Sequence, residues 1–121
     1  MAQHERFLSE MRLRRRADFQ KAYQRRCVAS DGLLLVFANL NGLDTPRLGL
    51  SVSRKVGGAV VRNRWKRRIR EAFRISRTEL PNGIDLVVIP KAAGEPEFSK
   101  LRESLIGLAR RLAQKLSRAA P

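Results

Sequence analysis

The sequence is poor in the residues that most protein catalysts use for acid–base or metal chemistry. It has one histidine, His4, and one cysteine, Cys27. A ribonuclease site built on two histidines is therefore excluded, as is a zinc site of cysteine and histidine ligands. A single cysteine cannot form an internal disulfide, which fits a reducing compartment.

Carboxylates are also few and dispersed. Among the eleven acidic residues, only Glu95 and Glu97 stand two positions apart, whereas a metal nuclease needs several convergent carboxylates. The sequence contains no glycine-rich phosphate loop of the P-loop or dinucleotide type. We therefore assign no catalytic residue and no metal ligand to this protein, and we expect no cleavage chemistry from the protein alone.

Long apolar runs are missing as well. The longest run, around residues 33–38, is far shorter than the ~20 residues that a membrane-spanning helix requires. The N-terminal stretch MAQHERFLSEMRLRRR lacks the apolar segment of a secretory signal. These absences predict a cytoplasmic protein without a membrane-spanning helix.

Positive charge, by contrast, is in excess. Lysine and arginine number 26 against 11 acidic residues, which gives a net charge of +15. Residues 12–26 contribute +6 and residues 54–77 contribute +9, so the whole surplus lies in two segments. A hydrophobic content of 43% supports a packed core. The combination indicates a folded protein with a polyanionic partner, either nucleic acid or an acidic membrane surface.

Hydrophobic periodicity predicts one α+β domain over residues 1–121, an α/β two-layer sandwich of helices on a small sheet. Residues 1–11 and 118–121 are expected to fray. The predicted order is α-β-β-(β)-α-β-α, where the bracketed strand is a short one near residues 27–29. The other elements are helix 18–26, strand 33–40, strand 47–53, helix 59–76, strand 84–89 and a last helix opened by Pro96.

The helix predicted over residues 59–76 has an apolar stripe and an arginine-rich opposite side. At 100° per residue, Val61, Trp65, Ile69, Ala72 and Phe73 fall within an arc of about 120°. We expect this stripe to pack on the sheet, with Trp65 in the core, so that the arginines face outward. The preceding Gly57-Gly58 pair either allows backbone N–H groups to approach a phosphate or forms a plain turn.

Two further features suit a single-stranded nucleic acid. Phe19 and Tyr23 share one helix face among basic residues, so they either stack on bases or dock their helix on the sheet. On the predicted strand 47–53, Gly49, Ser51 and Ser53 alternate with apolar residues. Their small side chains predict a shallow, open floor.

At GLSVSRKVGGAVVRNRWKRRIREAFR, residues 49–74, the sequence resembles the protein subunit of bacterial ribonuclease P. The match centres on Arg62-Asn63-Arg64 and extends to LRRRADFQKAY, residues 13–23, and GIDLVVIPK, residues 83–91. With the order of elements it covers roughly residues 12–117. A single RNR triplet is weak, but the long block with correctly placed flanking motifs is specific.

The resemblance implies a fold like the second domain of ribosomal protein S5, with a left-handed β-α-β crossover around the basic helix. It also implies that a separate RNA subunit performs Mg²⁺-dependent removal of the 5′ leader from precursor tRNA. The partners would then be the catalytic RNA and precursor tRNA, with no DNA and no membrane. Mg²⁺ would be bound mainly by the RNA subunit and the substrate, with none assigned to the protein.

The family's binding residues can be carried over to matching positions. Those implied to bind the RNA subunit are Arg62, Asn63, Arg64, Lys66, Arg67, Arg68 and Arg70. Those implied to bind the tRNA leader, in a cleft between the first helix and the sheet, are Phe19, Tyr23, Phe37, Ser51 and Lys55.

Three other interpretations compete with this one. A structural RNA-binding protein of ribosomal type would share the charge and the lack of catalysis, but would not account for the signature block and the aromatic pair together. A DNA-binding regulator would use residues 59–76 as a recognition helix and commonly form a dimer. A nuclease that acts without RNA is disfavoured by the residue inventory.

Overall fold

The computed structural model describes residues 9–119, and its centre is a four-stranded sheet in the order β1-β2-β4-β3. β1 pairs antiparallel with β2 and β2 antiparallel with β4, whereas β3 runs parallel to β4. The strands are β1 Cys27–Ser30, β2 Leu34–Leu40, β3 Arg47–Leu50 and β4 Ile84–Pro90. The helices are α1 Arg16–Arg25, α2 Ala59–Ile75 and α3 Phe98–Ala119.

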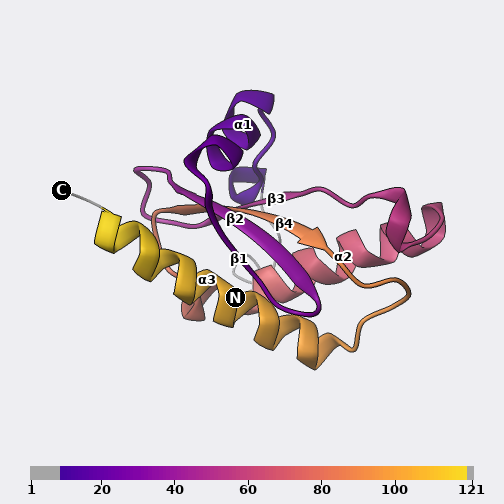
Figure 1. Ribbon diagram of the computed structural model, residues 1–121. Helices are drawn as coiled ribbons and strands as arrows, with labels where there is room; N and C mark the ends of the chain where they lie inside the picture. The colour runs from indigo at the N-terminus through magenta and orange to yellow at the C-terminus, as the bar shows by residue number, and fades with distance from the viewer. Residues whose placement is uncertain (1–8, 120–121) are drawn as a thin grey trace.

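The helices are divided between the two faces of the sheet. α2 and α3 lie along one face, and α1 lies on the other (Figure 1). This arrangement confirms the predicted α+β class and the order of elements, including the extra strand at β1. The sheet with α2 and α3 forms the expected two layers, and α1 covers part of the opposite face.

The main core lies between the sheet and the pair α2 and α3. In β2 every second residue is buried toward this core, since side chains alternate between the faces of a strand. The predicted stripe of α2 is buried at Trp65, Ile69, Ala72 and Phe73. Each large apolar side chain buried here stabilises the fold by about 1.5–3 kcal/mol. α3 completes the core with Leu101, Leu105, Leu108, Leu112 and Leu116.

β4 is the central strand and is buried on both faces. Its residues from Ile84 to Val88 are all buried, because α1 covers the side of the sheet that α2 and α3 leave open. This explains why the sequence shows a nearly continuous apolar run there instead of an alternation. The unit β3-α2-β4 joins two adjacent parallel strands through α2. The left-handed sense of this crossover and the likeness to ribosomal protein S5 stay predictions.

The N-terminal residues that the structure describes do not fray as expected. Residues 9–11 form a short 3₁₀ helix, and Met11 is 1% exposed in the main core. Arg12 forms a parallel bridge with Leu48, and the Leu13 N–H donates to the Leu48 carbonyl at 2.9 Å. The free edge of β3 offers these backbone partners, which local periodicity does not reveal. Residues 1–8, with His4, and 120–121 lie outside the described part, while 118 and 119 continue α3.

Several predicted boundaries shift by one to three residues; for example, β2 begins at Leu34, β4 ends at Pro90 and α3 begins at Phe98. α1 begins at Arg16, so that Asp18 lies in its first turn, where a carboxylate is favoured by the helix dipole. α2 ends at Ile75, and Ser76 caps it. The strand predicted over residues 47–53 ends at Leu50. The Ser51 N–H still donates to the Val88 carbonyl at 3.1 Å, but the chain then enters a 3₁₀ turn, Arg54–Val56, capped by Ser53.

No helix within residues 9–119 is both long enough and apolar enough to cross a membrane.

Candidate nucleic-acid interface

α1 is docked on the sheet by aromatic side chains that remain partly exposed. The Tyr23 and Phe37 rings meet edge to face, with their centroids 5.0 Å apart and an interplanar angle of 87°. Phe19, Tyr23 and Phe37 all pack around buried Leu13, Ala22 and Val87. Each ring is only half-buried. The aromatic pair predicted from the sequence therefore docks the helix and still presents ring surface to a ligand.

Gly49 is not part of an open floor, contrary to the sequence-based prediction. A Cβ atom added at Gly49 would lie 2.7 Å from Cζ of Phe19. The Phe19 ring thus rests directly on the backbone of β3, and Gly49 is buried beneath it. Glycine is required here because any side chain would displace the ring. The sequence could not show this contact, because Phe19 and Gly49 belong to separate elements.

The sheet surface beside α1 is more open two residues farther along the strands from Phe37 and Gly49. Phe37 and Gly49 both pair with Val87, and two residues on, Leu35 pairs with Ile89 while Ser51 extends β3. Since side chains two apart lie on the same face, Leu35, Ile89 and Ser51 continue the row of Phe37 and Gly49.

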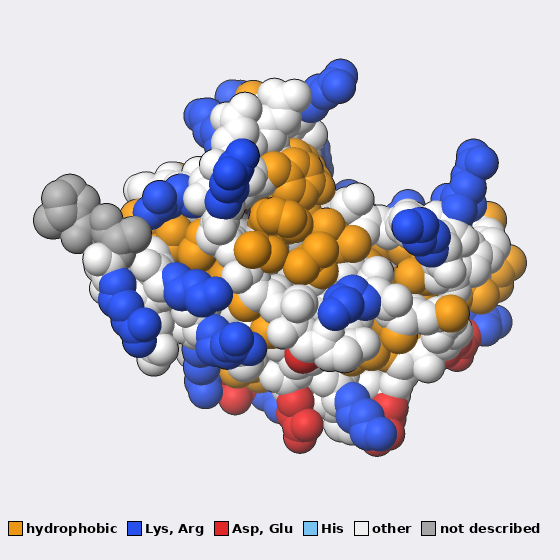
Figure 2. Space-filling model, viewed as in Figure 1, with side chains coloured by type: hydrophobic (Ala, Val, Ile, Leu, Met, Phe, Trp, Pro, Cys, Tyr) orange, Lys and Arg blue, Asp and Glu red, His pale blue; other side chains and the backbone are white. Residues whose placement is uncertain are grey.

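The predicted leader residues do not all lie in one cluster. Ser51 is exposed, beside Leu35 and Ile89, which are half-buried and were not among the predicted residues. Figure 2 shows apolar side chains gathered at the foot of α1 with lysine and arginine around them. The structure thus brings Phe19, Tyr23 and Phe37 together with Ser51 nearby. Lys55 is exposed in the turn after β3, outside this cluster.

The outward side of α2 carries the predicted basic surface. Because Trp65 and the rest of the stripe are buried, the residues between them point outward. Asn63, Arg64 and Arg67 are exposed. The Nε atom of Arg62 is buried and has no hydrogen-bond partner among the described residues. The remaining residues predicted to bind the RNA subunit are half-buried along the helix; they are Lys66, Arg68 and Arg70.

The loop before α3 is bound to one flank of α2. Glu95 forms an ion pair with Arg64 and a second with Arg68 at 3.4 Å. Arg68 also donates to the Pro96 carbonyl at 2.9 Å. The hydrogen bond from Arg64, and then the two positive charges, hold the pKa of Glu95 below its ordinary value. Two of the predicted RNA contacts therefore already have a carboxylate partner, which no local pattern in the sequence signalled.

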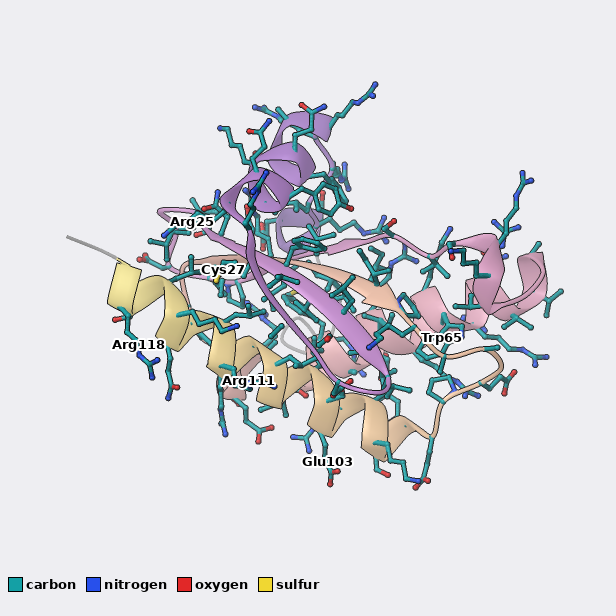
Figure 3. The ribbon with its side chains drawn as sticks, viewed as in Figure 1. Arg25, Cys27, Trp65, Glu103, Arg111 and Arg118 are labelled. Carbon is teal, nitrogen blue, oxygen red and sulfur yellow. The ribbon has the colours of Figure 1, made fainter. Side chains whose placement is uncertain are left out.

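Trp65 connects the same loop to the core. Its ring is fully buried, and its Nε1–H donates to the Gly94 carbonyl at 2.6 Å. Figure 3 shows Trp65 between α2 and the chain that leads into α3. The core position predicted for Trp65 is confirmed.

The two basic segments of the sequence meet at a small cavity beside β3. Burial lowers the pKa of Arg70, and the nearby positive charge of Arg12 lowers it further. Such convergence of like charges is relieved by a bound polyanion. The cavity has a volume of about 210 Å³ and is lined by Arg12, Leu13, Arg14, Phe19, Leu48, Leu50, Lys66 and Arg70. It therefore joins the aromatic surface to the basic helix.

An ion-pair network fixes α1 relative to the sheet. Arg47 of β3 donates to both carboxylate oxygens of Asp85 in β4, at 2.8 and 2.7 Å. The same guanidinium lies 3.9 Å from the Asp18 carboxylate in α1. Asn41 donates a further hydrogen bond to Asp85 at 2.9 Å. The hydrogen bonds to Asp85, and then the charges of Asp85 and Asp18, raise the pKa of Arg47. The network places the helix that carries Phe19 and Tyr23.

Within residues 9–119, no group of three or more histidine, cysteine, aspartate or glutamate side chains is arranged to hold a metal ion.

Comparisons with known proteins point to one family. The model of the family Ribonuclease P matches residues 7–113. The ribonuclease P protein component of Thermotoga maritima is 38% identical over 113 residues, which cover 89% of this chain and 97% of that protein.

Solved structures agree. The ribonuclease P protein of Thermotoga maritima superposes with a TM-score of 0.75 at 37% identity, covering 83% of this chain and 96% of that one. The protein from Staphylococcus aureus superposes with a TM-score of 0.72 at 32% identity, covering 84% and 94%.

Proposed function

Since the chain belongs to the ribonuclease P protein family, and so is a tRNA-processing subunit whose partner is a ribonuclease P RNA, we propose that it binds the catalytic RNA and the 5′ leader of precursor tRNA in the cytoplasm. The RNA subunit performs the cleavage that yields the mature 5′ end. The observation that carries the proposal is the convergence of the two basic segments beside the partly exposed aromatic rings.

The outward side of α2 binds the RNA subunit in this proposal. Arg62, Asn63, Arg64, Lys66, Arg67, Arg68 and Arg70 supply donors along one helix, which the buried stripe holds rigidly on the sheet. Arginine suits phosphate oxygens because its planar fork donates two parallel hydrogen bonds. Affinity from such contacts depends steeply on salt, since each neutralised phosphate releases counterions.

The surface beside α1 binds the leader. The exposed parts of the Phe19, Tyr23 and Phe37 rings offer stacking, which is worth ~1–3 kcal/mol per base. The neighbouring row of Leu35, Ile89 and Ser51 is apolar with a hydroxyl at its edge. Lys55 in the following turn adds charge for the leader backbone. Stacking and backbone contacts read little sequence, so leaders of different sequence are accepted.

The chain's own residues act by bringing two polyanions together. Their cations offset the repulsion between the phosphates of substrate and RNA subunit. Mg²⁺, bound mainly by the RNA subunit and the substrate, supplies Lewis-acid and nucleophile-activating chemistry when present. Because fewer free cations are then needed for assembly, the protein lowers the Mg²⁺ concentration required for cleavage.

The test is cleavage of a precursor tRNA by a bacterial ribonuclease P RNA at low Mg²⁺, with and without this protein. We expect cleavage at the mature 5′ end only when both subunits are present. Binding without improved cleavage would favour the structural RNA-binding alternative. Cleavage by the protein alone would contradict the proposal.

Replacing Phe19 with alanine is expected to weaken the binding of precursor tRNA to the holoenzyme about tenfold, corresponding to one lost stacking contact. Binding of mature tRNA, which has no leader, should stay nearly unchanged. Fluorescence titration with both tRNAs measures the difference. Arg67→Ala serves as the control, because it should weaken assembly with the RNA subunit instead. Equal losses for the two tRNAs would rule out the leader surface.

Replacing Glu95 with glutamine is expected to tighten binding of the RNA subunit a few-fold. The substitution removes the carboxylate that now pairs with Arg64 and Arg68, so both guanidiniums become available to phosphates. The dependence of log K on log salt should steepen by up to about one. Filter binding at several salt concentrations measures both quantities. Unchanged or weaker binding would show that the loop, not the free charge, is what the RNA needs.

A further inference from the structure

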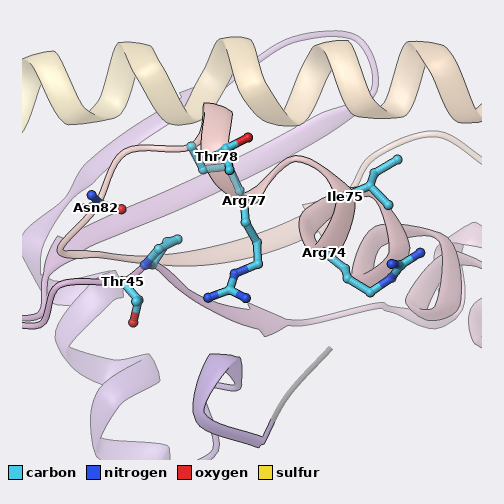
Figure 4. Close-up of a pocket in the computed structure, with 8 residues that line it drawn as sticks. Thr45, Arg74, Ile75, Arg77, Thr78 and Asn82 are labelled. Atoms are coloured by element: carbon cyan, nitrogen blue, oxygen red, sulfur yellow. The ribbon is translucent and has the colours of Figure 1, made fainter. Parts of the chain in front are cut away.

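A second and larger cavity lies at the C-terminal end of α2, outside the surfaces discussed above. Its volume is about 830 Å³, within the usual range for small-ligand sites. The turn after α2 forms one wall, and the loop between β2 and β3 forms the other (Figure 4). Its principal lining residues are Thr45, Arg74, Ile75, Arg77, Thr78 and Asn82.

Arg77 is the notable side chain of this cavity. It extends from the turn after α2 into the space between Thr45 and the helix end that carries Arg74 (Figure 4). Its guanidinium makes no hydrogen bond or ion pair with any residue in the described range 9–119. Arg77 is half-buried, and a cation in such a place that has no acceptor among the described residues can be satisfied by an anionic ligand. The side chains of Thr78 and Asn82 are exposed and can add hydrogen bonds.

The cavity also has an apolar side. Ile75 is 43% exposed at its rim. Leu80 and Pro46, both buried, form part of the lining. Cations, hydroxyl and amide groups, and an apolar surface together match the phosphate, sugar and base of one nucleotide.

A row of cations connects this cavity with the smaller one. Arg62, Lys66, Arg70 and Arg74 recur every four residues, so they lie along one line of α2. Each step advances about 6 Å along the helix. Arg77 continues the line into the turn Arg77–Glu79. Since Lys66 and Arg70 line the smaller cavity, one strand of phosphates can follow the row from there to Arg77.

Building on the proposed function, we propose that this cavity binds one unpaired nucleotide of the ribonuclease P RNA. Arg77 holds its phosphate, and Arg74, whose guanidinium is paired with Glu71 in the same helix, adds positive charge beside it. Thr45, Thr78 and Asn82 contact its sugar or base edge, and Ile75 supports the base. The RNA-binding surface thereby extends beyond Arg70 by two cations and by a loop from a different part of the chain.

The test compares Arg77→Gln with Arg118→Gln, a matched loss of one charge. Arg118 points away from the protein near the end of α3 (Figure 3) and is exposed. Affinity for a bacterial ribonuclease P RNA is measured over a range of salt concentrations. We expect Arg77→Gln to weaken binding about tenfold and to lower the salt slope by about one. Arg118→Gln should change neither quantity appreciably. Thermal unfolding verifies that both variants are folded.

Asn82→Ala tests whether a nucleotide is bound and not only a phosphate. It removes hydrogen bonds without changing charge, so it should weaken binding several-fold and leave the salt slope unaltered. If the Asn82→Ala variant binds the RNA as tightly as the wild type, the nucleotide site is wrong and the cavity makes only a charge contact.

Arg67→Gln separates this proposal from the one on which it rests. If Arg67→Gln weakens binding but Arg77→Gln behaves like Arg118→Gln, the cavity proposal is wrong and the proposed function stands. If the wild type does not bind the RNA, the proposed function itself fails. If Arg77→Gln affects only precursor tRNA binding by the holoenzyme, the occupant is the substrate and the proposed RNA-subunit contact is wrong.

Discussion

Replacing Trp65 with alanine is expected to lower the free energy of unfolding by about 4 kcal/mol, the cost typical of truncating a fully buried aromatic side chain. The ring is 0% exposed at the centre of the α2 stripe. Small domains of this size are stable by only about 5–15 kcal/mol. The variant should therefore be partly unfolded under mild denaturing conditions, and urea denaturation followed by circular dichroism measures the loss.

Trp65→Phe is the matched control. It keeps most of the apolar volume but removes the indole N–H that donates to the Gly94 carbonyl. Gly94 is exposed, so water can satisfy its carbonyl, and the expected loss is about 1–2 kcal/mol. A loss below about 1 kcal/mol for Trp65→Ala would contradict the close packing of α2 on the sheet. RNA binding should weaken in parallel with stability, because the same ring holds the basic helix in place.

Replacing Asp85 with alanine is expected to cost about 3 kcal/mol, the lower end of the range for breaking a buried ion pair. Asp85 is 5% exposed and accepts hydrogen bonds from Arg47 and Asn41. Without it, the Arg47 guanidinium is left largely desolvated and lacks its principal acceptor. Thermal unfolding at neutral pH measures the effect.

The double variant Arg47→Met with Asp85→Leu is the informative comparison. Replacing both charged partners removes the uncompensated charge, so it should cost less than Asp85→Ala alone. If the double variant is less stable than Asp85→Ala, the ion-pair network stabilises the fold more than the apolar pair that replaces it. Because Arg47 also faces Asp18, the single variant should loosen α1 and reduce discrimination for precursor tRNA.

Local periodicity was sufficient to predict the helices and strands in which each face carries residues of one type, apolar or polar. The α2 stripe of Val61, Trp65 and Ile69 repeats at helical spacing, so the buried face and the outward arginines follow from the sequence. The run from Ile84 to Ile89 predicted a central strand for the same reason, since a strand buried on both faces needs apolar residues at every position. The grouping of Phe19 with Tyr23 was predicted correctly because the two share a helix face, whereas Phe37 was placed beside them only by the family resemblance.

Features that depend on pairing between distant segments could not be predicted. Glu95 reaches Arg64 from the loop before α3, and Phe19 lies on Gly49 from another element. Likewise, nothing near Met11 in the sequence shows that the edge of β3 holds its segment in place. Charge and hydropathy patterns describe one segment at a time, whereas these contacts are set by the order of strands in the sheet.

The central position of β4 affects how the protein folds while it is synthesised on the ribosome. β4 is the last strand in the chain, yet it is the only partner of β3 among the named strands and pairs with β2 on its other side. Until residue 90 has emerged from the exit tunnel, β2 and β3 have no common neighbour, and α2 has no complete sheet to cover. The cationic segments are thus synthesised before the scaffold that orients them. Folding of the RNA-binding surface therefore has to wait for the synthesis of β4, and it depends on long-range contacts that form slowly.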